Sequence, residues 1–170
     1  MKKLHPNIYT KSIYSVNYDK LYKQGKRVIL FDLDNTLIAY YQNSTTKNLK
    51  KLIINIKKKG FDIYIFSNSI KEKKVKKIAK ELDIKYNLFS LKPLKYNFKK
   101  IIKKNNYKPE EIIIIGDQLF TDILGGNKIS ITTILVDPQS KNEPFFTRFI
   151  RIVERYIKKK GNIKIKENYE

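Results

Sequence analysis

Short, almost continuously apolar runs alternate along this chain with longer segments rich in lysine. The runs are rich in β-branched and aromatic residues, and such runs are typical of strands that are covered on both faces of a sheet. We therefore predict strands over residues 27–33, 61–67, 111–117 and 129–136.

The segments between the runs carry apolar residues at helical spacing. Residues 46–59 repeat leucine and isoleucine every three or four positions, and Gly60 follows as a helix stop. The same spacing predicts helices over 70–82 and 94–105. This alternation favours an α/β fold, a Rossmann-like three-layer sandwich in which a mostly parallel central sheet has helices on both faces.

Polar residues end three of the predicted strands. Asp32 and Asp34 end the first, Ser67 and Asn68 the second, and Asp117 the third. Because ligands of open parallel sheets bind beyond the carboxyl ends of the strands, we expect these side chains to meet at one rim of the sheet. Buried carboxylates are costly unless they are paired or bind a metal, so the first pair indicates a cation site.

The amino-acid composition limits the kinds of partner and of catalysis that the protein can have. Lys and Arg number 37 against 16 Asp and Glu, and the formal net charge of +21 favours acidic partners such as nucleic acid, anionic lipid or phosphorylated substrates. A general compositional bias explains the charge equally well. The absence of cysteine excludes disulfides and thiolate catalysis, and the one histidine, His5, precedes all periodic segments. Without a signal core or a run of about 20 apolar residues, we expect a soluble, cytoplasmic protein.

The order of the polar residues fits phosphoryl transfer through an aspartate nucleophile. Asp32 would attack phosphorus and form an acyl phosphate. Asp34 would protonate the leaving oxygen and then activate water. Mg²⁺ prefers oxygen ligands, and Asp32, the Asp34 backbone carbonyl and Asp117 would supply them.

Phosphate oxygens also need hydrogen-bond donors and positive charge. Lys92 would stabilise the developing negative charge, with Lys95 as a nearby rival. Asp122 would support the metal shell or orient that lysine. Ser67 and Asp117 have a structural alternative, as helix caps. The residues that we predict to bind phosphate are Thr36, Ser67, Asn68 and Lys92.

Four segments, "FDLDNTL", "FSNS", "LKP" and "GDQLFTD", resemble in order and spacing the four motifs of haloacid dehalogenase-like (HAD) phosphatases. "DNTL" and "GDQLFTDILGGN" are similar to the class IIIA branch, and more narrowly to the YqeG-type family that includes mitochondrial phosphatidylglycerophosphatases. The resemblance covers nearly the whole chain. It implies a Mg²⁺-dependent phosphatase that converts phosphatidylglycerophosphate to phosphatidylglycerol.

The resemblance also implies a role for each motif residue. It makes Asp32 the nucleophile, Asp34 the acid and base, and Lys92 the stabilising lysine. The remaining matches are Ser67 as the phosphate-binding residue, Asp117 as a metal ligand and Asp122 as the second acid of the fourth motif.

The spacing of the motifs leaves no room for a cap domain. One helix and one strand use most of the chain between Thr36 and Ser67, and one helix and a connection fill the stretch from Ser67 to Lys92. An open site suits a large or membrane-borne phosphate ester, although such a site could also close by oligomerisation. Two alternatives stay open: a capless phosphatase for soluble sugar or nucleotide phosphates, and a basic nucleic-acid-binding protein. No RNA-binding motif is present, so we expect no specific nucleic acid partner.

The C-terminal part of the chain predicts one more helix. We expect a single phosphatase domain over residues 1–157 and a basic polar tail over 158–170. Residues 144–160 form a basic amphipathic pattern, whose apolar face we expect to cover one side of the sheet. Peripheral contact with an anionic membrane is the alternative use of this pattern. The apolar positions are Phe145, Phe146, Phe149, Ile150, Val153, Tyr156 and Ile157.

Overall fold

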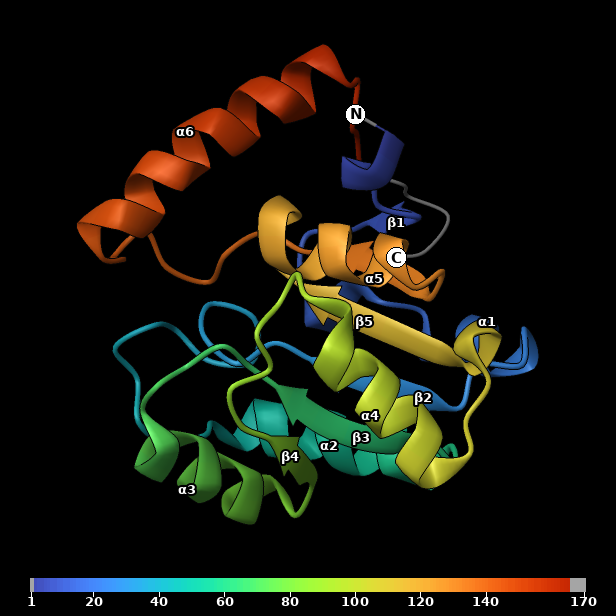
Figure 1. Cartoon of the computed structure of the whole chain (residues 1–170). Coiled ribbons are helices and arrows are strands. Elements are labelled where there is room, and N and C mark those ends of the chain that lie inside the picture. The colour runs from blue at the N-terminus through green and yellow to red at the C-terminus, as the bar shows by residue number, and fades with distance from the viewer. Residues whose placement is uncertain (1, 166–170) are drawn as a thin grey trace.

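Six strands form one sheet in the order β1-β6-β5-β2-β3-β4, and every pairing in it is parallel (Figure 1). The computed structural model describes residues 2–165. The predicted α/β fold with a parallel central sheet is confirmed. The strands are β1 (Ile8–Tyr9), β2 (Val28–Phe31), β3 (Asp62–Phe66), β4 (Lys85–Asn87), β5 (Ile112–Gly116) and β6 (Thr132–Leu135).

The four apolar runs form β2, β3, β5 and β6, whereas the two edge strands were not predicted. β1 and β4 contain only two and three residues, too few to give a recognisable apolar pattern. The helices predicted over 46–59, 70–82 and 94–105 are α2 (Lys47–Lys58), α3 (Glu72–Leu82) and α4 (Lys95–Asn105). The remaining helices are α1 (Tyr18–Lys23), α5 (Leu124–Lys128), α6 (Phe145–Lys160), the π-helical turn η4 (Leu119–Ile123) and the 3₁₀ turns η1 (Lys2–Leu4), η2 (Ile13–Ser15) and η3 (Pro109–Glu111).

Helices cover both faces of the sheet, which explains why the central strand β2 is apolar at every position. In β2, Ile29 and Phe31 point into a core shared with α2 and α3, while Val28 and Leu30 point into a core shared with α4. α2 and α4 accordingly lie on opposite sides of the sheet (Figure 1). Successive strand residues face opposite sides, so both sets must be apolar to be buried.

The strand order changes direction at β2. The chain runs outward from β2 through β3 to β4, then returns to place β5 on the other side of β2. The register pairs Phe31 with Ile115, and the Asp32 amide donates to the Ile115 carbonyl oxygen at 2.9 Å. The residues after β2 and β5 therefore lie together at the switch point of the sheet, where ligands of such folds bind.

The segments between the motifs contain the predicted elements and, in the second segment, the short edge strand β4 as well. α2 and β3 lie between Thr36 and Ser67, and α3 and β4 lie between Ser67 and Lys92. These elements belong to the sheet and its helical layer. The rim at the switch point is consequently not covered by a domain inserted at either place.

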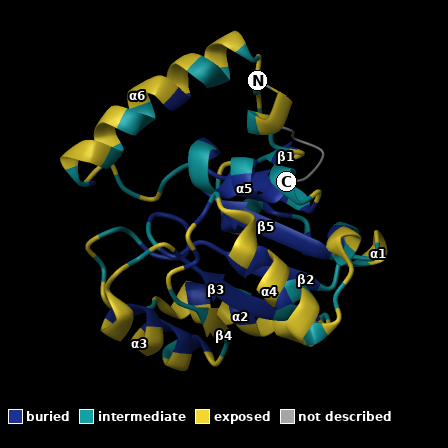
Figure 2. Ribbon diagram, in the orientation of Figure 1, coloured by how far each residue is buried: buried dark blue, intermediate teal, exposed yellow. Residues whose placement is uncertain are grey.

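The prediction that the apolar face of α6 covers the sheet is wrong for most of the helix, although Ile157 packs against a core cluster that includes Leu135 of β6. The buried residue of the helix is Glu154, whereas Phe145 and Phe149 are exposed, and Figure 2 shows exposed residues along most of the helix. The charged side packs inward because Arg151 and Glu154 bond there to Asp117 and to the backbone at the start of η4.

α6 also extends to Lys160, so the basic segment expected from Lys158 starts inside the helix, and residues 166–170 of that predicted tail lie outside the described residues. None of the helices within residues 2–165 has the length and apolar content needed to cross a bilayer.

Candidate active site

Three buried aspartates from the rim of the sheet converge on one point. Asp32 follows β2, Asp117 follows β5, and Asp122 lies in η4. One carboxylate oxygen from each lies within 4.8 Å of the others, close enough for one cation to contact all three. The expected meeting of residues that are far apart in sequence therefore occurs at the predicted end of the strands.

Lys92 lies within this group of acids. Its ammonium donates to Oδ1 of Asp32 and to Oδ1 of Asp122, both at 2.6 Å, and its side chain is 1% exposed. The rival lysine, Lys95, is exposed at the start of α4. Lys92 is thus the lysine that can reach a phosphate held at the acids.

The three acids carry more negative charge than Lys92 neutralises. Burial raises the pKa of Asp32 to about 8; Lys92 opposes this shift, while Asp122 and Asp117 add to it. Burial also raises the pKa of Asp117 to about 6, although Arg151 opposes the shift. Buried oxygen ligands that resist ionising together fit a hard divalent cation such as Mg²⁺, which would relieve their repulsion.

Asp34 does not join the acidic cluster with its side chain. Its Oδ1 accepts from the ammonium of Lys74 at 2.6 Å, and Lys74 also donates to the Tyr40 carbonyl oxygen at 2.6 Å. This arrangement leaves the backbone carbonyl of Asp34 as its candidate metal ligand. The sequence analysis missed Lys74. The sequence does contain a signal for this role: Lys74 lies on the same helical stripe as the apolar residues Ile78 and Leu82. A lysine on such a buried stripe needs an acidic or hydrogen-bonding partner, which is here Asp34.

Two of the residues that we expect to bind phosphate, Thr36 and Asn68, form hydrogen bonds with other groups of the site. The Thr36 hydroxyl donates to Oδ1 of Asp117 at 3.1 Å and so helps to position that carboxylate. The Asn68 amide donates to the Lys92 carbonyl oxygen and accepts from the Lys92 amide, both at 2.8 Å. Asn68 therefore fixes the backbone that carries Lys92. Ser67 is buried, and its hydroxyl accepts from the Ser69 amide at 3.0 Å.

Helix α6 supplies a second set of charges behind the acids, which the sequence analysis also missed. Arg151 donates to the Asp117 carbonyl oxygen at 2.6 Å and forms ion pairs with the carboxylates of Asp117, Glu143 and Glu154. Oε1 of Glu154 accepts from the amides of Leu119, at 2.6 Å, and Phe120, at 3.3 Å, which begin η4. These contacts bind α6 to the loop that carries Asp117 and Asp122.

A cavity of about 290 Å³ opens above Asp32. It is lined mainly by polar side chains from the strand ends, from the loop after β3 and from the start of α6. The lining residues include Asp32, Asp34, Ser67, Lys92, Glu143 and Thr147.

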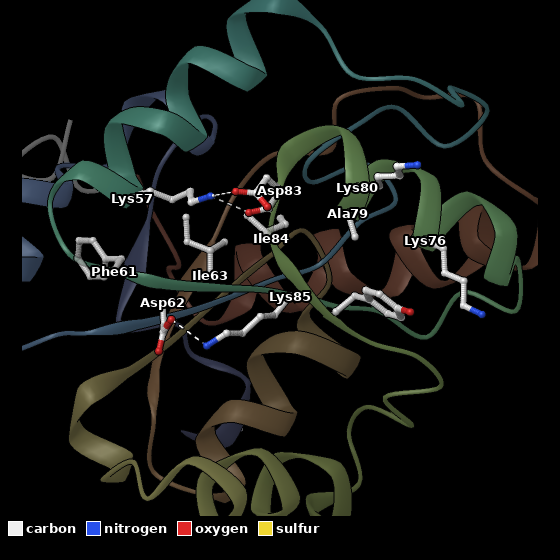
Figure 3. Close-up of a pocket in the computed structure, with 11 residues that line it drawn as sticks. Lys57, Phe61, Asp62, Ile63, Lys76, Ala79, Lys80, Asp83, Ile84 and Lys85 are labelled. Atoms are coloured by element: carbon white, nitrogen blue, oxygen red, sulfur yellow. Dashed lines mark hydrogen bonds and ion pairs between the residues drawn. The ribbon is translucent and has the colours of Figure 1, made fainter.

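A larger hollow of about 650 Å³ lies at the opposite end of the sheet, beside the start of β3 (Figure 3). Its two aspartates are already paired, Asp62 with Lys85 at 3.0 Å and Asp83 with Lys57 at 2.5 Å. The other lining residues are mainly lysines and apolar side chains. This hollow does not contain the carboxylates that phosphoryl transfer requires.

Comparison with known proteins agrees with this geometry. A family model described as mitochondrial PGP phosphatase matches residues 1–139. "Probable phosphatase YqeG" of Bacillus subtilis (strain 168) is 36% identical over 166 residues, which cover 95% of this chain and 96% of the relative. "Phosphatidylglycerophosphate phosphatase 1, chloroplastic/mitochondrial" of Arabidopsis thaliana is 30% identical over 164 residues, which cover 91% of this chain and 47% of that protein.

Among solved structures, an uncharacterized protein from Listeria monocytogenes serotype 4b superposes with a TM-score of 0.55 at 19% identity. The match covers 69% of this chain and 85% of that one. At this identity the likeness concerns the fold alone.

Proposed function

Because the chain belongs to the family described as mitochondrial PGP phosphatase, we propose that it hydrolyses the phosphomonoester of phosphatidylglycerophosphate and leaves phosphatidylglycerol. Membership makes the protein a HAD-type phosphatase; its nucleophile, metal and lipid substrate are the proposal. The observation that carries the chemistry is the convergence of Asp32, Asp117 and Asp122, the first and last of which pair with the Lys92 ammonium.

Asp32 is the proposed nucleophile because it lines the cavity and follows the central strand. Its carboxylate oxygen forms a bond to phosphorus as the bond from phosphorus to the lipid oxygen breaks. Asp34 gives its proton to that leaving oxygen, then takes one from the water that attacks phosphorus. As the water oxygen bonds to phosphorus, the bond from phosphorus to Asp32 breaks, which releases inorganic phosphate and restores the Asp32 carboxylate. Lys74 holds the Asp34 carboxylate at the cavity wall, so that one group can serve both steps.

Lys92 and Ser67 are the proposed phosphate contacts. Lys92 brings positive charge to the developing negative charge, and both residues line the cavity that contains Asp32. The groups that would hold Mg²⁺ are the carboxylates of Asp32 and Asp117 and the backbone carbonyl of Asp34. Asp122 would orient Lys92 through their ion pair. When bound, Mg²⁺ would supply positive charge that polarises the phosphate group.

The size and openness of the cavity support a lipid headgroup as substrate. A volume of about 290 Å³ accommodates a phosphate and a glycerol unit, but not acyl chains. A lipid would therefore be attacked with its chains outside the protein. We place this reaction at the cytoplasmic side of a membrane. Soluble sugar or nucleotide phosphates, the alternative substrates, would also fit.

A phosphate-release panel with and without Mg²⁺ tests the proposal. Its substrates are detergent-dispersed phosphatidylglycerophosphate, a sugar phosphate and a nucleotide monophosphate. We expect Mg²⁺-dependent release from the lipid, reduced by roughly a thousandfold or more in Asp32→Asn. Asp83→Asn, which changes an exposed aspartate far from the cavity, should retain activity. Release from the soluble substrates alone would reject the lipid but keep the enzyme class, while an active Asp32→Asn would reject the nucleophile.

A further inference from the structure

Helix α6 presents a continuous apolar stripe to the outside of the molecule. Phe145, Phe149, Ile152 and Tyr156 recur every three or four residues, which places them on one side of a helix. Their exposed fractions are 85%, 60%, 55% and 64%. We name these four residues the α6 stripe. Exposed apolar surface of this extent on one element marks an interaction site rather than ordinary surface variation.

The stripe is held outward by the opposite side of the same helix. Arg151 and Glu154 face the body of the protein, where they bond to Asp117 and to the start of η4. Turning the helix to bury the stripe would remove these partners and leave buried charges without compensation. The outward orientation is therefore a stable feature of the fold.

Positive charge borders the stripe. Arg148 and Arg155 are exposed, and both neighbour Ile152 on the helix surface, being four and three residues away. Lys159 and Lys160 end the helix. Within the described ranges, none of the ion pairs uses any of these four cations. An apolar stripe beside cations on one helix is the composition of helices that lie in the plane of an anionic bilayer.

We propose that α6 docks the protein on an anionic lipid bilayer, with the α6 stripe inserted at the headgroup level and the flanking cations on lipid phosphates. Charge favours this occupant over a second copy of the chain, because pairing two α6 helices would bring Arg148 and Arg155 of each copy close together. A net charge of +21 makes such pairing still less favourable.

Docking in this way would place the catalytic cavity beside the first turn of the docked helix, on the side of α6 that faces the body of the protein. Thr147, in the first turn of α6, and Glu143, just before it, both line the cavity that contains Asp32. This use of the helix rests on the proposed lipid substrate, but the docking itself is measured without catalysis.

Vesicle flotation tests the proposal on the full chain. The probes are vesicles of phosphatidylcholine alone and vesicles that also contain phosphatidylglycerol, in low and high salt. We expect binding to the anionic vesicles that weakens as salt rises. Phe149→Ser/Ile152→Ser should lower the partition coefficient roughly tenfold or more, because two inserted side chains are lost. Arg148→Ser/Arg155→Ser should lower it by roughly tenfold on anionic vesicles only.

Matched control variants test whether the loss of vesicle binding is specific to α6 or follows from removing any exposed apolar residue or cation. Tyr14→Ser/Ile54→Ser removes one aromatic residue and one isoleucine that are each 50% exposed elsewhere. Lys51→Ser/Lys58→Ser removes two exposed cations seven residues apart on α2, the same separation as in the arginine pair. Both controls should bind nearly as the unchanged chain does.

Three outcomes would overturn the docking proposal. The first is a partition coefficient of Phe149→Ser/Ile152→Ser equal to that of the unchanged chain. The second is an equal fall of the partition coefficient in the control variants. The third is a dimer of the unchanged chain that Phe149→Ser/Ile152→Ser converts to a monomer while vesicle binding persists. The last outcome would identify a second copy as the occupant. Vesicle binding with no phosphate release from the lipid would instead reject the proposed substrate and retain the docking, because flotation measures binding without catalysis. If the enzyme is active, the Phe149→Ser/Ile152→Ser variant should keep its activity on detergent-dispersed substrate within about twofold.

Discussion

Arg151 of α6 bonds to Asp117 twice, through the backbone carbonyl oxygen at 2.6 Å and through the carboxylate. The same guanidinium pairs with Glu143 at 2.8 Å and with Glu154 at 3.1 Å. One cation thus compensates three buried acids, one of which is a proposed metal ligand. The C-terminal helix is in this way part of the support of the active site.

Replacing this guanidinium should destabilise the protein strongly. Arg151→Ala leaves Asp117, Glu143 and Glu154 buried without their cation, and we expect the free energy of unfolding to fall by about 3 kcal/mol. Urea denaturation monitored by circular dichroism measures this loss.

The matched control is on the same helix. Arg148→Ala removes an exposed guanidinium and should change the free energy of unfolding by less than about 0.5 kcal/mol. Similar losses in the two variants would mean that the buried pairs do not contribute as we infer.

Magnesium should stabilise the folded chain, because it binds the converged carboxylates of the native state only. At a concentration of about 100 times its dissociation constant, the gain is about 2.7 kcal/mol. A thermal melt with Mg²⁺ or with a chelator measures the shift in Tm. Asp117→Asn should lose most of the shift, and Asp83→Asn should keep it. An unchanged shift in Asp117→Asn would exclude this carboxylate as a ligand.

A single added methyl at the end of β5 should displace a catalytic-site acid. The β-carbon of Gly116→Ala would overlap the Asp122 carboxylate, which must then move away from Lys92. We expect kcat to fall roughly tenfold to a hundredfold, since small misplacements at a site are costly. Phosphate release by the purified variant measures this effect.

Gly126→Ala provides the comparison, because it overpacks the core without touching the acids. Its β-carbon would lie 2.5 Å from Thr133 Cγ2 and 2.7 Å from Ile114 Cγ2. Such overpacking should cost about 1–3 kcal/mol of stability. If both variants lose activity only in proportion to their unfolded fraction, Asp122 has no special role.

Lys74 should matter for turnover more than for substrate binding. Lys74→Met removes the partner that holds the Asp34 carboxylate, so we expect kcat to fall roughly tenfold with little change in KM. Lys77→Met on the same helix removes an exposed lysine, 3.8 Å from Glu81, and should keep both constants. A rise in KM at constant kcat would indicate instead that Lys74 binds substrate.

The positions of the motif aspartates follow from local sequence. Asp32 and Asp117 each come directly after an apolar run, and parallel strands bring their carboxyl ends to one rim. The identity of their partners does not follow from local sequence. The bond from Thr36 to Asp117, for example, depends on how the loop after β2 packs against the end of β5.

The sequence by itself determined the layers of the fold, because apolar runs without alternation are stable only when both faces of a sheet are covered. It also determined which end of the sheet collects the acids and the lysine of the motifs. Only the tertiary structure decided which side of α6 faces inward. An amphipathic pattern distinguishes two sides of a helix, and the side that packs is the one whose partners are present. Here those partners are the backbone and carboxylate of Asp117 and the amides that begin η4, so the charged side is buried and the apolar side is exposed.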